Sequence, residues 1–113
     1  MHEASLARGI LAAILDQVGP GERVRVVRGW LAQTEVLDPL SIRMHFLGMA
    51  RGTVAEGAAL ELKLTHVAAR CLDCATEYLP EHHLTLCPAC GSTEAELIGE
   101  VGLGIDEIDV APG

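Results

Sequence analysis

The chain has 113 residues, half of them apolar, and a formal net charge of −8. A chain of this length can bury one modest core. The acidic charge argues against nucleic-acid binding, which usually rests on clustered Lys and Arg. No apolar run approaches the roughly 20 residues that a membrane-spanning helix needs, and Met1-His2-Glu3 lacks the basic start of a signal peptide. We therefore expect a cytoplasmic protein that binds neither nucleic acid nor membranes.

The first predicted elements are a helix and a strand. Between residues 4 and 18 apolar side chains recur at helical spacing, and Gly19-Pro20-Gly21 then ends the helix. Residues 22–31 follow as a strand, in which Val27 breaks the alternation and indicates a bulge. Trp30 needs a partner for its ring nitrogen if it is buried. The apolar side of the predicted helix consists of Leu6, Ile10, Leu11, Ile14, Leu15 and Val18.

A second helix and a second strand follow. Asp38-Pro39 is a favourable helix start, because aspartate can cap free amides and proline suits the first helical position. Gly52 can end this helix in a left-handed turn. Residues 58–65 alternate between apolar and polar side chains and form the clearest predicted strand. The apolar side of the second helix is predicted to be Leu40, Met44, Phe46, Leu47 and Ala50.

The last third of the chain changes character. Residues 68–98 hold cysteines and turn residues in place of a regular period, and a strand-like pattern returns between Leu103 and Val110. A lone strand is not stable, so we expect it to rejoin the first sheet. The prediction is an α+β fold: residues 1–67 and 99–113 form a small three-stranded sheet with two helices, and residues 68–98 form an inserted four-cysteine, zinc-ribbon-like domain.

The four cysteines form two Cys-x-x-Cys pairs, Cys71/Cys74 and Cys87/Cys90. Twelve residues separate the pairs, which lets two turns present four thiolates to one ion, and this spacing is typical of a zinc ribbon. Four ordinary buried thiols or a dithiol redox couple are the alternatives. The redox alternative lacks the strand-to-helix context of a thioredoxin-like motif.

The amino terminus offers nitrogen ligands of another kind. The α-amine of Met1, the amide of His2 and its imidazole can close adjacent chelate rings, which suit Ni(II) or Cu(II) better than zinc. A histidine at position 2 is otherwise a solvated terminal residue. Glu3 is an acid in the first helical turn, where it complements the helix dipole.

The other histidines have simpler interpretations. His82 and His83, between the cysteine pairs, could ligate a metal but are expected to be exposed polar residues. His45 and His66 lie in apolar surroundings and are expected to be partly buried and hydrogen-bonded.

Several stretches of the sequence match a known pattern: Met1-His2-Glu3 with Ser5-Leu6, the segment from Arg51-Gly52-Thr53 to Glu56-Gly57-Ala58, both Cys-x-x-Cys pairs and the strand from Ile105 to Val110. Together they resemble the HypA/HybF nickel-metallochaperones of hydrogenase maturation. The resemblance runs in order through nearly the whole chain. In that family a two-helix, three-stranded nickel domain carries an inserted four-cysteine zinc domain.

The resemblance implies a metal carrier and not an enzyme. Ni(II) would bind at the amino terminus through His2 and adjacent backbone nitrogens, with Glu3 at or beside the site, and a structural zinc would bind Cys71, Cys74, Cys87 and Cys90. Family members deliver nickel with a partner GTPase, HypB, to the large-subunit precursor of nickel-iron hydrogenase, and in some organisms to urease. The client enzyme, the oligomeric state and any part played by His82 or His83 stay open.

Two other classes of function fit parts of the sequence. A zinc-ribbon interaction module of transcription or translation explains the cysteines, but neither the acidic charge nor the amino terminus. A dithiol oxidoreductase predicts reversible oxidation of the cysteine pairs without bound metal. Metal content distinguishes the last class from the others.

Overall fold

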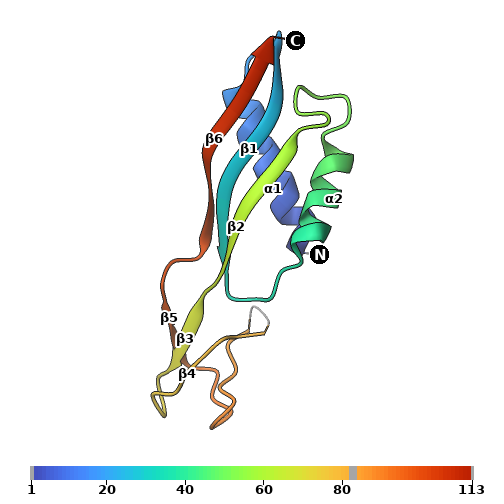
Figure 1. Cartoon of the computed structure of the whole chain (residues 1–113). Helices are drawn as coiled ribbons and strands as arrows, with labels where there is room; N and C mark the ends of the chain where they lie inside the picture. The colour runs from blue at the N-terminus through green and yellow to red at the C-terminus, as the bar shows by residue number, and fades with distance from the viewer. Residues whose placement is uncertain (1, 82–83, 113) are drawn as a thin grey trace. The chain divides into compact units, whose positions relative to one another are not determined.

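The computed structural model describes residues 2–81 and 84–112, and of His2 only the backbone. Within these residues two helices, α1 (His2–Gln17) and α2 (Pro39–Met49), accompany a three-stranded sheet of order β2-β1-β6 (Figure 1). Its strands are β1 (Glu22–Gln33), β2 (Ala59–His66) and β6 (Gly102–Pro112). The predicted α+β class is confirmed, as is the return of the C-terminal strand to the first sheet. No helix of the described part is long and apolar enough to cross a membrane.

The chain divides into two compact units. The first contains Met1–Trp30, Asp38–Lys63 and Leu103–Gly113, and the second contains Leu31–Leu37 and Leu64–Gly102. The predicted metal-binding insertion, residues 68–98, falls wholly inside the second unit. That unit extends beyond the predicted boundaries because nonlocal bonds hold further segments: the Val67 amide donates to the Gln33 carbonyl at 2.8 Å and the Val36 amide to the Glu81 carbonyl at 3.3 Å.

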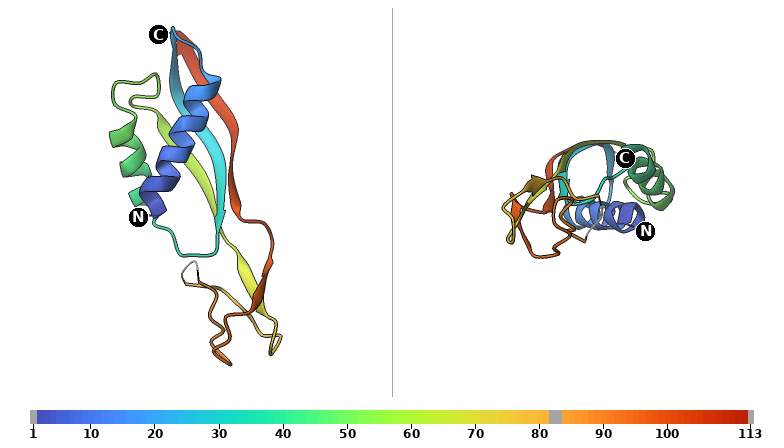
Figure 2. Two further views of the ribbon diagram at one scale, coloured as in Figure 1. Left: turned by 180° about the vertical axis from the view of Figure 1, so that it is seen from behind. Right: turned by 90° about the horizontal axis from the view of Figure 1, so that it is seen from below.

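The core of the first unit lies between the helices and one face of the sheet. Figure 2 shows α1 crossing that face with α2 beside it. The predicted apolar face of α1 is correct at its centre, where Ile10, Leu11 and Ile14 are buried. Leu15, which was predicted to belong to this face, is exposed, and Ala7, which was not, is buried. The buried residues of this core include Ala7, Ile10, Ile14, Val24, Val27, Ile42, Phe46 and Ala50.

The predicted apolar face of α2 is wrong in part. The helix begins as expected, with Asp38 as the cap whose carboxylate accepts from the Leu40 amide at 3.0 Å. Ile42 and Phe46 are the buried side chains of α2, since residues four apart lie on one side of a helix. Phe46 and Ala50 from the predicted set are buried, whereas Leu40, Met44 and Leu47 are exposed.

Strand β1 carries the irregularity that the sequence indicated. Val24 is buried, and the buried positions then shift by one residue to Val27, as an extra residue in a bulge would produce. Further along, a Cβ on Gly29 would lie 2.3 Å from the Gly104 carbonyl oxygen, so this close approach of β1 and β6 requires glycine. The indole of Trp30 lies over Gly104, and the side chain is 38% exposed.

The strand predicted from alternation is the most regular one. In β2, Leu60 is buried and Leu62 and Leu64 are partly buried, while the residues between them are exposed. Exposed ion pairs link the strands of the sheet, with Arg28 pairing Glu61 at 3.0 Å and Glu107 at 3.1 Å. Exposed pairs of this kind contribute at most about 1 kcal/mol each, so the apolar core stabilises the sheet.

The second unit holds a smaller sheet of order β4-β3-β5. Its strands are β3 (Ala68–Cys71), β4 (Glu77–Tyr78) and β5 (Ala95–Ile98), all antiparallel to their neighbours. The Arg70 guanidinium on β3 pairs with Glu77 on β4 at 3.3 Å and with Glu96 on β5 at 3.0 Å. The sheet is short, and Cys71, at the end of its central strand, leads into the first cysteine turn.

Candidate metal centre

All four cysteines of the sequence meet at one place in the second unit. Their sulfur atoms lie within 4.8 Å of one another. Cys71 Sγ is 3.5 Å from Cys90 Sγ, and Cys74 Sγ is 3.6 Å from Cys87 Sγ. A zinc ion with Zn–S bonds of about 2.3 Å in a tetrahedron needs sulfurs about 3.8 Å apart. Each close pair joins one cysteine from each motif, as a single ion between two turns requires.

The two cysteine turns have the same backbone pattern. In the first turn the Cys71 amide donates to the Thr76 carbonyl and the Ala75 amide donates to the Cys71 carbonyl, both at 2.9 Å. In the second turn the Cys87 amide donates to the Ser92 carbonyl and the Gly91 amide to the Cys87 carbonyl, again at 2.9 Å. Each turn is therefore closed by its own backbone, which sets the direction of both cysteine side chains.

The residue after the second cysteine of each turn is left-handed. Gly91 has φ of 77°, which glycine adopts freely, whereas Ala75 has φ of 64° and is the one described non-glycine residue with positive φ. A left-handed conformation costs an L-residue about 1 to 2 kcal/mol. The first turn is therefore strained where the second is not.

We expect Ala75→Gly to stabilise the metal-loaded second unit by roughly 1 kcal/mol, less the added chain entropy of glycine in the unfolded state. Hydrogen exchange of the Cys71 and Thr76 amides should slow, since both belong to this turn. Ala89→Gly, in the second turn but outside any left-handed position, is the matched control and should not stabilise. Faster exchange in Ala75→Gly would contradict the strain argument.

The electrostatics of the metal-free cluster are uneven. The Thr76 hydroxyl, 3.1 Å from Cys74 Sγ, and the Thr76 amide lower the pKa of Cys74 to about 6. At Cys90 the Ser92 amide lowers the pKa, but hydrogen bonding with Cys71, desolvation and the other two thiols outweigh it and raise the pKa to about 12. In the metal-free cluster the Cys74 thiol therefore loses its proton readily, whereas the Cys90 thiol keeps its proton.

A divalent metal removes this conflict, because coordination deprotonates a thiol outright. The donor set is four soft sulfurs with tetrahedral spacing, which fits zinc and leaves no position open for a substrate. Two of the ligands, Cys71 and Cys87, are buried, and Cys74 and Cys90 are exposed. The four sulfurs therefore form a closed site, in which one ion would cross-link the two cysteine turns.

Thr76 and Ser92, which lie beside the cysteines, were not predicted from the sequence. Ala75 and Thr76 follow Cys74 as Gly91 and Ser92 follow Cys90. Both turns therefore read Cys-x-x-Cys-x-Ser/Thr, and this repeat could have indicated their shared geometry. In the second turn the Ser92 hydroxyl also donates to the Asp73 carboxylate of the first.

The proposed amino-terminal site is described only in part. Met1 and the His2 side chain lie outside the described residues, as do His82 and His83. Glu3 lies in the first turn of α1, and its carboxylate is 3.5 Å from the amide of Asp38, the cap of α2. Whether His2 and Glu3 form a metal site therefore stays a prediction.

The two remaining histidines are described. His66 is partly buried, and its Nε2 reaches the Thr34 carbonyl at 3.2 Å and the Pro80 carbonyl. Both partners are acceptors, so Nε2 carries the proton. The expected hydrogen-bonded role of His66 is confirmed. His45 is partly buried as expected, but its ring makes no hydrogen bond within the described residues.

The sequence is similar to known proteins along nearly its whole length. Residues 1–110 match the family described as "Hydrogenase/urease nickel incorporation, metallochaperone, hypA". The chain belongs to the HypA family. Curated HypA hydrogenase maturation factors include one from Acidithiobacillus ferrooxidans, 34% identical over 97% of this chain and 99% of the relative, and one from Dechloromonas aromatica, 33% identical with the same coverage.

Solved structures agree on the fold of this HypA chain. The solution structure of the nickel metallochaperone HypA from Helicobacter pylori matches with a TM-score of 0.55 at 16% identity, covering 98% of each chain. A second HypA solution structure matches with a TM-score of 0.53 at 18% identity. The family is one of metallochaperones and not of enzymes, which confirms the predicted class of function.

Proposed function

We propose that this HypA chain binds Ni(II) at its amino terminus and delivers it for maturation of nickel-iron hydrogenase, or of urease where that is the client. The observation that carries the proposal is the match of residues 1–110 to a family defined by nickel incorporation. The chain also aligns with 99% of the length of two curated hydrogenase maturation factors.

Zinc is proposed as the resident metal of the cysteine cluster. Cys71, Cys74, Cys87 and Cys90 would supply all four ligands, and the ion would supply the cross-link that two short turns lack. A four-sulfur shell is saturated, so it suits a structural ion better than cargo that must leave. The closed backbone of each turn supports this role, because it holds the sulfurs near the required spacing before metal binds.

Nickel is proposed to bind nitrogen ligands at the start of α1. The first amides of a helix have no carbonyl acceptor within the helix, and α1 begins at His2. An amide nitrogen that has lost its proton is anionic, and the positive end of the helix dipole favours that charge. The Met1 amine and the His2 imidazole would complete chelate rings with such nitrogens, in the planar arrangement that Ni(II) accepts.

Glu3 is proposed to lie at or beside the nickel site. Its carboxylate accepts from the Asp38 amide at 3.5 Å, a long hydrogen bond that leaves most of its acceptor capacity free. It could supply an oxygen ligand or a hydrogen bond to a metal-bound group. Because Asp38 caps α2, the same contact ties the start of one helix to the start of the other.

The two proposed sites differ in their open coordination positions, and this difference would let the chain deliver nickel while it keeps zinc. A terminal site with few ligands leaves coordination positions open, so a client protein can add its own ligands before the carrier releases the ion. The proposed partners are a HypB-type GTPase and the hydrogenase large-subunit precursor, with urease maturation factors in organisms that use them. The zinc shell, being full, would not exchange during this transfer.

The deciding experiment is a calorimetric Ni(II) titration of zinc-loaded, untagged protein that begins at Met1. A second protein with one extra residue before Met1 keeps every side chain but moves the α-amine away from His2. We expect one tight nickel site that weakens sharply in the extended protein, over a constant single zinc counted by mass spectrometry. Equal, weak binding in both would leave a zinc-stapled interaction module in place of a nickel carrier.

A further inference from the structure

A groove in the first unit has no part in either proposed metal site. It has a volume of about 700 Å³ and lies between α2 and β2, with one wall from the helix and one from the strand. Six consecutive residues of the strand wall, 58 to 63, line it. Successive side chains of a strand point to opposite faces, so a groove lined by all six reaches the outer edge of β2, while Arg28 and Gly29 of β1 extend its lining over the sheet.

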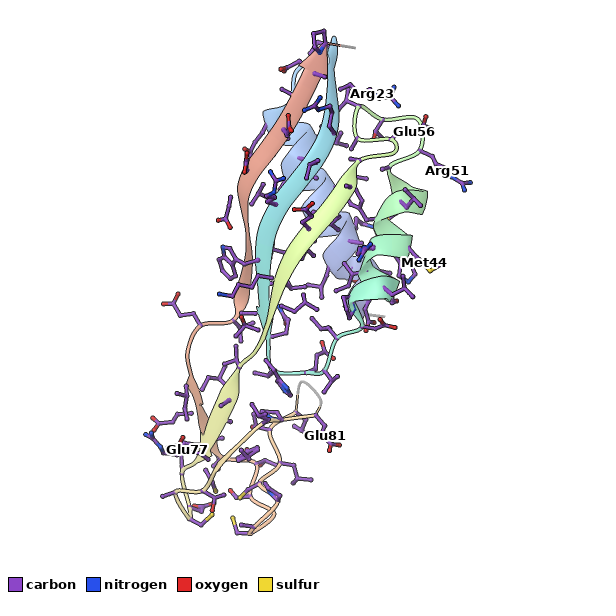
Figure 3. The ribbon with its side chains drawn as sticks, in the orientation of Figure 1. Arg23, Met44, Arg51, Glu56, Glu77 and Glu81 are labelled. Atoms are coloured by element: carbon purple, nitrogen blue, oxygen red, sulfur yellow. The ribbon has the colours of Figure 1, made fainter. Side chains whose placement is uncertain are left out.

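The helix wall of the groove carries exposed apolar side chains. Leu40, Met44 and Leu47 are 59%, 64% and 52% exposed, and their spacing of four and three residues puts them on one side of α2. Met44 also lines the groove, and Figure 3 shows its end on the outer side of α2, so it forms the outer rim of the helix wall. This second apolar face of α2 is separate from the buried face formed by Ile42 and Phe46.

The charge of the groove is opposite to that of the chain. Helix α2 contains no acidic residue, although the chain has twice as many acidic as basic residues. Arg43 and Lys63 both line the groove, and neither has an ion-pair or hydrogen-bond partner in the described part of the chain. The one acid in the lining, Glu61, is already paired with Arg28 at 3.0 Å.

The strand wall adds backbone groups that can bind a partner. β2 is the edge of its sheet, and within the described residues no turn, cap or loop hydrogen bond involves positions 59 to 63. An edge strand presents a row of unpaired N–H and C=O groups, a template for one further strand. The groove therefore combines an open strand edge, an apolar helix wall and unpaired cations.

We propose that this groove is a docking site for an extended, acidic and apolar segment of a protein partner, which adds to the sheet beside β2. Main-chain hydrogen bonds to the strand edge supply affinity in this mode, and alternate side chains supply specificity. Apolar side chains of the segment pack on Leu40, Met44 and Leu47, and its carboxylates meet Arg43 and Lys63. The proposal does not depend on which metal the chain carries.

A second copy of this chain fits the groove less well. A symmetric dimer brings the same patch of both copies together, so Arg43 and Lys63 of one copy would meet the equally cationic patch of the other. Like charges placed opposite one another oppose association. A partner with acidic and apolar side chains meets no such repulsion.

The probe is a capped peptide of about six residues that alternates glutamate with valine, titrated into the zinc-loaded full chain and followed by amide NMR. We expect shifts confined to residues 40–47 and 59–63. Raising the salt to about 1 M, where the screening length falls to about 3 Å, should weaken binding several-fold. A peptide with lysine in place of glutamate should bind at least about tenfold more weakly.

Matched variants test the two walls of the groove. Lys63→Glu should weaken the glutamate peptide about tenfold, whereas Arg8→Glu, an exposed cation on α1 outside the groove, should leave its affinity unchanged. Leu47→Ala should weaken it several-fold, and Leu15→Ala, an exposed leucine of α1 outside the lining, should not.

Four outcomes would overturn the proposal. Absence of shifts at millimolar peptide would show that the edge does not accept a strand. Shifts that spread over other surfaces, or equal loss of binding in Lys63→Glu and Arg8→Glu, would reveal nonspecific charge attraction. Concentration-dependent association of the free chain through residues 40–47 and 59–63 would assign the groove to a second copy.

Discussion

Replacement of Cys87 by alanine is expected to remove zinc from the protein and to unfold the second unit, with the first unit left folded. The second unit has a very small core, in which two of the buried residues are the ligands Cys71 and Cys87 themselves. A domain this small usually needs a metal or disulfides to fold. Structural zinc supplies about 10 to 16 kcal/mol of apparent binding free energy at neutral pH. Loss of one ligand should remove most of this free energy and unfold the second unit.

The measurement counts zinc per chain by native mass spectrometry and follows both units by amide NMR. Signals from 64–102 should collapse toward random-coil positions in Cys87→Ala, and those from α1 and α2 should keep their dispersion. Leu86→Ala is the matched control, because Leu86 is the neighbouring side chain and is 57% exposed. Full zinc content and unchanged melting of Cys87→Ala would contradict a structural role for the cluster.

Acid should release the proposed zinc. Protons compete with the metal for the thiolates, so zinc affinity falls as pH falls. In the metal-free cluster Cys90, with its pKa raised to about 12, still holds its proton at neutral pH, while Cys74, lowered to about 6, is mostly ionised. Zinc binding at neutral pH must therefore displace at least the Cys90 proton, which calorimetry in buffers of different ionisation enthalpy detects.

The parts of the fold that the sequence predicted well depend on local signals. The alternation of residues 58–65 defined β2, and Asp38-Pro39 defined the start of α2, because each pattern acts within a few residues of chain. The cysteine spacing likewise predicted that four sulfurs would converge, and they do.

The errors arise where packing between distant segments decides. Helix α2 has apolar residues on two sides, and only packing against distant segments, α1 among them, determines that Ile42 and Phe46 turn inward while Leu40 and Met44 stay exposed. Distant contacts also decide the extent of the second unit, since no local signal predicts that the Val67 amide donates to the Gln33 carbonyl. Periodicity identifies a helix with apolar side chains but not which of two faces meets the core.

His2→Ala is expected to weaken Ni(II) binding by on the order of 100-fold or more, with zinc content and fold unchanged. The imidazole is the one side-chain nitrogen of the proposed chelate, and without it Ni(II) keeps only the amine and amides. Calorimetric titration of zinc-loaded, untagged protein measures the change. His45→Ala is the matched control, because it removes an imidazole from α2, away from the amino terminus. Loss of zinc in His2→Ala would contradict two independent sites.

The pH dependence of nickel binding identifies its ligands more sharply than any single variant. The α-amine, with a pKa of about 7.8, and the imidazole, with a pKa of about 6.5, must both lose protons to bind. Between about pH 7.5 and about pH 6 their protonation alone should weaken nickel binding roughly 80-fold. Ionisation of one backbone amide would add a further factor of about 30 over the same range, since such a proton is held at both pH values. A decline near fourfold would implicate an imidazole without the amine, and the site would then lie elsewhere in the chain.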